Sequence, residues 1–519
     1  MLSHLAILAS VLTTVVHGYD IGCLYPEEMP HPIKARNDFV LSQTVQLVGA
    51  GLETPIAVYN SHHHHQCESN CLAFHDDKSL NVLTMERPIF STPPEYFNSW
   101  SRFLCMLQCY PTKNDSLFKK WNFQRLPLNA ELVACSGDAE CLELIAIEQD
   151  YDPRIIGQIV MLEIDEYHDT DGWNSKGTLT YDHKTGAPTE CTANCAPFSD
   201  TTGYFPRNHP KYFDTPPTVL TGNDIYWQPL VEVTNQGSFV RQDHVTPHIG
   251  YTAHPLLLSE FKETADPGYD YLAESVLLLQ RLADLTGDNV RQEKIKFYDN
   301  KLAVRHLIQF SFIDEVPELT FEDFLMFLIG ISSVEHDAVV SCWREKVRHD
   351  RVRPTTVVQT QNDIIVDTFN PAPGATTPAS IAARDFVPYI RTMPHSEYPS
   401  GSAAICTGYA DFTDLFTTEY FGVKLDLFEV NDVEHDFCKN YGVACTASFS
   451  VDGTTELAEE CGESRLWSGV HFGASIPAGK ELGDGLGELG LEFVKTVKAG
   501  TNWTSTTTAS SYTRPVCGM

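Results

Sequence analysis

Cationic side chains are scarce in this chain of 519 residues, which has 36 Lys and Arg against 69 Asp and Glu. The formal net charge of −33 repels polyphosphates and anionic membranes over long range, so we expect neither nucleic acid nor a membrane as a partner. Where Lys and Arg nevertheless gather in so acidic a protein, we expect them to hold an anion.

Long apolar runs, internal repeats and low-complexity tracts are also missing. Residues 1–18 are typical of a signal peptide, because the apolar run from Leu5 to Val16 is too short to span a bilayer. Val16 and Gly18 are small residues suited to cleavage before Tyr19. No later segment reaches the roughly 18 apolar residues of a membrane span. We therefore expect a secreted, extracellular protein or one that resides in a lumen.

Cysteine, in contrast, is plentiful, with 15 residues. Several lie in close pairs, which predict disulfides in an oxidising compartment, although the sequence does not determine the partners. These pairs are Cys67/Cys71, Cys105/Cys109, Cys135/Cys141, Cys191/Cys195 and Cys438/Cys445. The odd total leaves at least one thiol free or paired with another chain, and a homo-oligomer stays open.

Helical periodicity is concentrated in the second half of the chain, so the expected fold class is mainly α. We expect a loop-rich, Cys-rich region at 19–128, a first helical part with long loops at 129–254, a helix-bundle core at 255–500 and a tail at 501–519. The N-terminal region would be irregular and stapled by disulfides. Within the core, helices are predicted at 271–285, 292–311, 321–353, 381–390, 402–421 and 468–498.

A run of four histidines occupies positions 62–65, close to Cys67 and Cys71. Such a run could bind a metal ion. In a secreted chain, beside a predicted disulfide, we interpret it instead as a solvent-exposed loop.

Lys346 and Arg353 are the first candidate anion ligands. Seven residues make about two helical turns, so both side chains would project from one helix face. Pro354 disfavours helix at the residue before it, which would put Arg353 at the helix end. An ordinary basic surface is the alternative, because three further arginines lie in the same stretch.

The segment Pro399-Ser400-Gly401 comes directly before a predicted helix. Ser400 or Ser402 is suited to the N-cap position. The start of a helix presents unpaired N–H groups to anions, and Gly401 would let an oxyanion approach the backbone closely. A capped helix without a ligand is the alternative.

Arg465 and His471 form the third motif. On one continuous helix their side chains would point apart. Gly469, with Ser468 as an N-cap, would place Arg465 in a turn and His471 in the first turn of the next helix, where the two can converge.

Together and in this order, the three motifs resemble those of the vanadium-dependent haloperoxidases, which share a superfamily with the type-2 phosphatidic-acid phosphatases. The resemblance covers about residues 130–500 and includes the runs 227–230 and 242–248. It implies bound vanadate, with His471 as the axial ligand of the metal. The implied cofactor-binding residues are Lys346, Arg353, Ser400, Gly401, Arg465 and His471.

One member of the family's pattern is absent. The position after Gly401, which usually holds an acid–base histidine, is Ser402 here. A hydroxyl can hydrogen-bond the apical oxygen, but it cannot shuttle a proton near neutral pH as an imidazole can. His395 matches a second histidine near the metal in algal bromoperoxidases, so it would replace that relay. Trp343 matches a tryptophan on the halide side, which with His395 would form the halide pocket.

The resemblance implies an enzyme that uses hydrogen peroxide to oxidise halide to hypohalous acid, which halogenates a small organic acceptor. The catalytic residues would be His471, Lys346, His395 and Ser402. Bromide or iodide is favoured over chloride, because His395 stands where fungal chloroperoxidases have Phe.

Two other functions stay open. An acid phosphatase or phosphotransferase would use His471 as its nucleophile, although its leaving-group acid is not evident. A non-catalytic secreted protein would keep these six cofactor-binding residues, the anion cradle, to bind phosphate alone.

Overall fold

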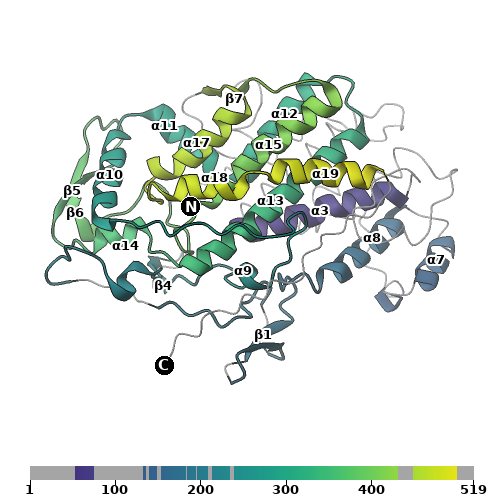
Figure 1. The fold of residues 1–519 in the computed structure, drawn as a ribbon, viewed down its shortest axis with the longest axis horizontal. Coiled ribbons are helices and arrows are strands. Elements are labelled where there is room, and N and C mark those ends of the chain that lie inside the picture. Colours follow the sequence, from purple (N-terminus) through teal and green to yellow (C-terminus); the bar gives the residue numbers. More distant parts are fainter. Residues whose placement is uncertain are drawn as a thin grey trace.

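In a computed structural model of the chain, mainly helical elements surround one long central helix (Figure 1). The described residues are 53–74, 133–135, 139–148, 153–182, 184–193, 196–207, 213–233, 239–430 and 448–499. The expected mainly α, helix-bundle fold class is confirmed. The predicted signal peptide and tail, Cys105/Cys109 and Cys438/Cys445 lie outside the described residues.

The central helix is α13 (Phe321–His349), whose N terminus is capped by the Thr320 side chain accepting the N–H of Asp323. Its apolar residues recur at three- and four-residue steps and pack on several sides. By length and composition α13 could cross a membrane, but its apolar window is wholly buried inside the protein, as in the core helix of a bundle.

Several helices pack directly on α13. They are α3 (Thr54–Phe74), α9 (Ile249–Thr252), α15 (Gly401–Phe421), α18 (Ser475–Gly483) and α19 (Leu486–Lys498). Helix α17 (Gly453–Trp467) packs along α15. Close packing of α18 on the start of α15 depends on a glycine, because a Cβ at Gly479 would lie 2.3 Å from the carbonyl oxygen of Ser400.

The core between α12 (Lys301–Glu315), α13 and α15 is aromatic. Phe312, Phe327 and Phe416 are each 0 % exposed. Their ring centroids lie 4.8 Å apart for Phe312–Phe327 and 5.4 Å apart for Phe327–Phe416. Burying each such ring contributes roughly 1.5–3 kcal/mol, so this cluster holds the bundle beneath the site together.

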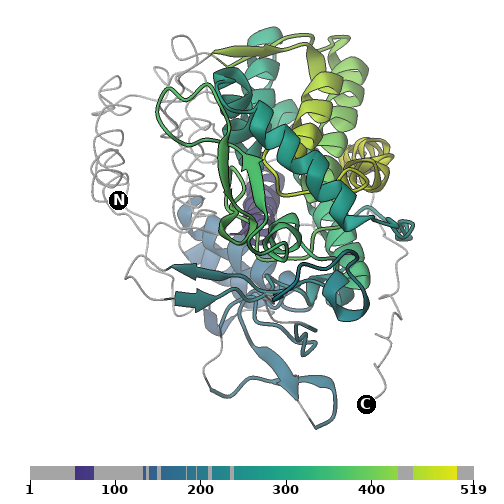
Figure 2. The same ribbon diagram turned by 90° about the vertical axis from the view of Figure 1, so that its left-hand side faces the viewer.

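The remaining elements surround this bundle. The helices are α7 (Ala139–Glu148), α8 (Pro153–His168), α10 (Tyr271–Asp284), α11 (Asn289–Asp299), α12 (Lys301–Glu315) and α14 (Pro354–Gln359), with 3-10 turns η3 (Gly222–Ile225) and η4 (Ala383–Asp385). The strands are β1 (Leu179–Asp182), β2 (Ala187–Glu190), β3 (Val231–Val233), β4 (Phe239–Arg241), β5 (Ile365–Thr368), β6 (Ala379–Ala382), β7 (Phe428–Val430) and β8 (Phe449–Val451). Consecutive strands form antiparallel two-stranded sheets, and the β1–β2 hairpin projects away from the bundle in both views (Figures 1 and 2).

Several predicted helix boundaries were wrong. The helix predicted at 321–353 ends at His349, because Asp350 takes the left-handed conformation with φ 50°. The helix predicted at 292–311 is two helices that break at Asn300, which caps the second by accepting the N–H of Ala303. The helix predicted at 468–498 is likewise two, α18 and α19. The segment 381–390 is not an α-helix, since it contains the end of β6 and the turn η4.

The interpretation of the histidine run as a solvent-exposed loop was also wrong. Residues 62–65 lie within α3, where His62 and His65 are 1 % and 2 % exposed. The Nδ1 atom of His62 lies 3.1 Å from the hydroxyl of Ser332 on α13. Nearby, Arg305 bridges Glu335 and Ser61, and both nitrogen–oxygen distances are 2.5 Å. Polar partners on α12 and α13 therefore compensate part of the burial of this polar helix, while the Nε2 of His62 and the Nδ2 of Asn70 are buried without a hydrogen-bond partner in the part of the chain that the structure describes. Among the described residues, no group of His, Cys, Asp and Glu is arranged to hold a metal ion.

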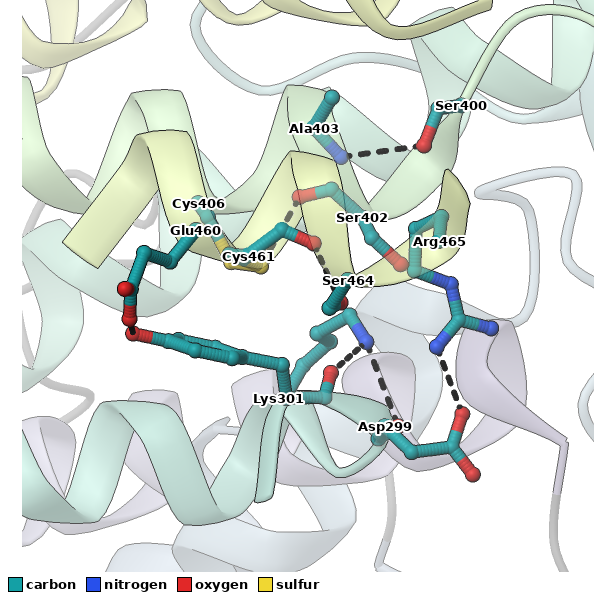
Figure 3. Close-up of a disulfide and its surroundings, with 11 residues drawn as sticks. Asp299, Lys301, Ser400, Ser402, Ala403, Cys406, Glu460, Cys461, Ser464 and Arg465 are labelled. Atoms are coloured by element: carbon teal, nitrogen blue, oxygen red, sulfur yellow. Dashed lines mark hydrogen bonds and ion pairs between the residues drawn. A yellow bond between two sulfur atoms is a disulfide. The ribbon is translucent and has the colours of Figure 1, made fainter. Parts of the chain in front are cut away.

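Two disulfides have both cysteines in the described part of the chain. The Cys135–Cys141 bond confirms one of the close pairs. The second, Cys406–Cys461, joins α15 to α17 across 55 residues and was not predicted, because no short spacing marks it (Figure 3). Cys342 is buried and free, in keeping with the odd cysteine total.

Removing the long-range disulfide should destabilise the fold. The variant Cys406→Ala/Cys461→Ala should lose about 2–4 kcal/mol of unfolding free energy, because the bond restricts a 55-residue loop in the unfolded chain. Urea denaturation followed by circular dichroism measures the loss. The control Cys135→Ala/Cys141→Ala opens a loop of only 6 residues and should lose less. Equal losses in the two variants would contradict this explanation.

Candidate active site

Arg353 is the buried centre of the candidate site. It is 1 % exposed and is the N-cap residue of α14, in extended conformation beyond the end of α13. Its Nε donates to the carbonyl oxygen of His395 at 2.8 Å, and its Nη1 donates to that of Val470, also at 2.8 Å. The guanidinium thus joins the loop before α15 to the turn before α18.

His471 faces Arg353 on one side and a carboxylate on the other. Its Nε2 lies 3.3 Å from Arg353 Nη1, and its Nδ1 lies 3.0 Å from Glu397 Oε1. Burial, reinforced by the charges of Arg353, Lys346 and Arg465, lowers the pKa of His471 well below its usual value. The imidazole is therefore neutral near pH 7, which a metal ligand or a nucleophile requires.

Lys346 is fully buried and donates to three backbone carbonyl oxygens of the loop before α15. The acceptors are Ser396 and Glu397, each at 2.9 Å, and Pro399 at 2.5 Å. Burial lowers the pKa of Lys346 to about 7. All three ammonium protons thus donate to carbonyl oxygens of this loop. Lys346 could donate to an oxyanion only if one of these three hydrogen bonds were broken.

Ser400 is the N-cap of α15, as predicted, and its hydroxyl accepts the N–H of Ala403 at 3.3 Å. Gly401 and Ser402 are the first two residues of the helix and are half-buried. The N–H groups of this first turn have no acceptor within the helix itself, so they can bind an anion.

Arg465 lies at the end of α17, on the same side of the disulfide as Ser400 and Ser402 (Figure 3). Its Nη1 donates to Asp299 Oδ1 at 2.9 Å, and its Nη2 contacts the sulfur of Met393 at 3.3 Å. Its Nε is buried without a hydrogen-bond partner. An unpaired buried guanidinium N–H is costly, and an oxyanion would satisfy it.

His395 and Trp343 lie together, as the predicted halide pocket requires. Their ring centroids are 4.7 Å apart, and Arg353 Nη2 lies 3.0 Å from His395 Nδ1. A guanidinium only donates, whereas the Ser396 carbonyl oxygen, 3.2 Å from the same Nδ1, only accepts, so these two contacts do not select one tautomer of His395. Burial and the neighbouring Arg353 and Lys346 lower the pKa of His395 well below its usual value.

The local structure around Arg465 and His471 is the reverse of the prediction. Arg465 lies in the last turn of a helix, and His471 lies in the turn that follows it. Ser468 is the C-cap of α17 rather than an N-cap, and Gly469 reverses the chain with φ 78°. Similarly, Lys346 and Arg353 converge because the chain bends at Asp350, rather than because they share a helix face.

The structure also brings residues to the site that the sequence did not single out. Glu397 contacts His471, Asp299 contacts Arg465, and the Nε2 atom of His244 accepts the N–H of Ser396 at 3.2 Å. Glu397 had one signal, since it is an acidic residue two positions before the Pro-Ser-Gly segment. Asp299 lies 166 positions from Arg465 and had none.

The residues present fit a multiply charged oxyanion. Buried cations surround the neutral His471, the first turn of α15 adds backbone N–H groups, and the Nε of Arg465 has no partner. Arrangements of this kind bind tetrahedral anions such as vanadate or phosphate through charge-assisted hydrogen bonds.

Comparisons with known proteins identify the fold that carries this arrangement. Residues 326–500 match the family described as "VCPO second helical-bundle domain". A holo-type bacterial vanadium-dependent chloroperoxidase has TM-score 0.63 at 18 % identity, covering 86 % of this chain and 93 % of that one. Its apo-type structure has TM-score 0.64 at 17 % identity, covering 86 % and 95 %. A bacterial vanadium-dependent iodoperoxidase has TM-score 0.53 at 16 % identity, covering 89 % and 95 %. No curated protein matches the sequence.

The chain therefore has the vanadium haloperoxidase fold, and residues 326–500 form its second helical bundle. The family resemblance inferred from the motifs is confirmed.

Anion binding should depend on Arg465. The variant Arg465→Ala should weaken the binding of inorganic phosphate by about tenfold to a hundredfold, because a charge-assisted hydrogen bond contributes about 1.5–3 kcal/mol. Isothermal titration calorimetry of the purified protein measures the change. Arg384→Ala removes a half-exposed arginine paired with Asp363 and should leave phosphate affinity unchanged. If Arg465→Ala bound phosphate as tightly as the unmodified protein, Arg465 would not belong to the cradle.

Proposed function

We propose that the protein is a vanadate-dependent haloperoxidase, which uses hydrogen peroxide to oxidise halide to hypohalous acid. The observation that carries this proposal is the convergence of buried Arg353, Lys346 and Arg465 around the neutral His471. The matched fold supports it, since structures similar in fold include a bacterial vanadium-dependent chloroperoxidase and a vanadium-dependent iodoperoxidase.

In this proposal Arg353, Arg465, Ser400 and Gly401 hold the oxygens of vanadate, and His471 supplies the nitrogen ligand through Nε2. Lys346 acts mainly by holding the loop that carries Ser400. The chemistry that vanadate supplies when bound is the activation of hydrogen peroxide towards attack by halide. The surrounding cations are preorganised and shielded from water, so they withdraw negative charge without having to reorganise.

Proton supply falls to His395. Formation of hypohalous acid and water from peroxide and halide consumes one proton, and Ser402 cannot provide it near neutral pH. Its imidazole lies beside Arg353, whose Nη2 is 3.0 Å from Nδ1 of His395. A bound anion would offset the positive charge of Arg353 and Lys346 and so raise the pKa of His395 towards a useful value.

The preferred halide follows from the residues of the halide pocket, His395 and Trp343. We propose bromide or iodide rather than chloride, because the imidazole of His395 makes the pocket beside Trp343 polar. The hypohalous acid would then halogenate a small organic acceptor. We also propose secretion, which the disulfides Cys135–Cys141 and Cys406–Cys461 support, because such bonds persist in oxidising compartments.

A phosphatase or phosphotransferase is the second candidate, because the same cradle fits phosphate. A neutral His471 with a carboxylate at Nδ1 is also the arrangement of an activated nucleophile. Ser402, however, stands where a leaving-group acid would be needed, and a serine hydroxyl is a poor general acid.

A pair of assays separates these functions. The purified apo-protein should brominate monochlorodimedone with hydrogen peroxide and bromide only after orthovanadate is added. His471→Ala should abolish both vanadium binding and this activity. Hydrolysis of p-nitrophenyl phosphate without vanadate-dependent bromination would contradict the proposal in favour of a phosphatase. Phosphate binding without either activity would indicate a binding protein.

His395→Ala should slow bromination by about a hundredfold or more, because a positioned acid–base group contributes on that order. Its orthovanadate affinity should change little, since other residues hold the anion. Steady-state kinetics and equilibrium dialysis measure the two quantities, and the exposed His254 provides the control variant His254→Ala. An unchanged turnover number in His395→Ala would remove His395 from the mechanism.

A further inference from the structure

We infer that Glu397 is the positioning residue for His471, whose imidazole it holds with the Nε2 lone pair directed into the anion cradle. The inference rests on the proposed function, since it concerns how His471 meets the bound centre. It assigns a role to a residue that none of the three sequence motifs contains.

Several hydrogen bonds fix the carboxylate of Glu397 in place. The residue is 0 % exposed. Its Oε1 lies 3.0 Å from Nδ1 of His471 and 3.0 Å from the backbone nitrogen of Phe472. Its Oε2 accepts the hydroxyl proton of Tyr269 at 3.2 Å. The same carboxylate oxygen thus contacts both the imidazole of His471 and the backbone N–H of Phe472.

These contacts fit the ionised form of Glu397, in which both carboxylate oxygens accept hydrogen bonds. The N–H of Phe472 can only donate, and it shares Oε1 with the imidazole, so no proton can occupy that oxygen. The Tyr269 hydroxyl donates to the other oxygen. An ionised carboxylate can only accept, so the proton of His471 lies on Nδ1 and its lone pair on Nε2.

A second contact supports this tautomer independently. Nε2 of His471 lies 3.3 Å from Nη1 of Arg353, and a guanidinium has no lone pair to offer. Nε2 must therefore be the accepting nitrogen. The hydroxyl of Ser475 also lies 3.0 Å from Nδ1, but a hydroxyl can donate or accept and so does not select the tautomer. The carboxylate of Glu397 therefore selects the tautomer of His471, whereas Ser475 does not.

The position of Glu397 links His471 to the rest of the cradle. Its own carbonyl oxygen accepts a proton of Lys346 at 2.9 Å, and its backbone N–H donates to the carbonyl oxygen of Arg351 at 2.9 Å. The backbone that places the carboxylate is therefore held by the same helix end that supplies the cations.

Glu397 has opposite effects on two kinds of anion. Its negative charge beside Arg353 and Lys346 weakens binding that is purely ionic. The same charge makes the imidazole of His471 a better donor, which strengthens a bond from Nε2 to vanadium. Phosphate at equilibrium gains only the ionic interaction, whereas vanadate gains both. The two anions should therefore respond differently when the charge is removed.

The variant Glu397→Gln tests this difference in the full-length protein. Its amide oxygen can still accept from Phe472 and His471, and its amide NH₂ can donate to the Tyr269 oxygen, so the fold should be retained. Orthovanadate affinity, measured by equilibrium dialysis, should fall by about 10–100-fold, as is typical when a partner of a metal ligand is lost. Inorganic phosphate affinity, measured by calorimetry, should not fall. The control Ser475→Ala should change neither affinity appreciably.

Each contrary result has a distinct meaning. Equal orthovanadate affinity in Glu397→Gln and the unmodified protein would overturn the inference alone. A parallel loss of both anions with a lowered melting temperature would reduce Glu397 to a structural role and also overturn it. A comparable vanadate loss in Ser475→Ala would transfer the role to Ser475. Unmodified protein that binds no orthovanadate would overturn the proposed function and, with it, this inference.

Discussion

The buried guanidinium of Arg353 is the group on which the geometry of the site depends. It donates to the carbonyl oxygen of His395, 42 positions away along the chain, and to that of Val470, 117 positions away in the turn that carries His471. A guanidinium cannot easily lose its proton, although burial lowers the pKa of Arg353 to about 10. Its charge and its fork of donors therefore persist, and they orient both imidazoles at once.

Hydrogen bonds to protein oxygen atoms, rather than to solvent, offset the free-energy cost of burying the cations in the site. Carbonyl oxygens of the loop before α15 surround Lys346, and Asp299 pairs with Arg465. Burial of charge without such partners would be strongly unfavourable. The result is a cradle that is positive before any anion arrives, in a protein whose overall charge is −33. Such preorganisation is what electrostatic catalysis requires.

Ser402 and His395 distinguish this site from the usual pattern of the vanadium haloperoxidases that its motifs resemble. The serine leaves the first turn of α15 without an acid–base group, while His395 lies against Trp343 and Arg353. In the proposed function, proton transfer and anion binding therefore fall to different segments of the chain. Glu397, two residues after His395, contacts His471 from the same loop, so in that function this short segment would serve both the metal ligand and the proton carrier.

The residue types of the cradle could be identified without a structure, because few other side chains suit a multiply charged oxyanion and their order along the chain is distinctive. The helices at 271–285 and 402–421 were also predictable, since each has an N-cap residue and a regular apolar face. Local patterns could not reveal the bend at Asp350, the burial of the histidine run or helix α17, whose sequence has no clear apolar stripe. The Cys406–Cys461 bond and the Glu397–His471 contact were equally hidden, because each joins residues more than fifty positions apart. Such pairs are decided by the packing of α13, α15, α17 and α18 around a common core, and the sequence encodes that packing only through the whole set of contacts.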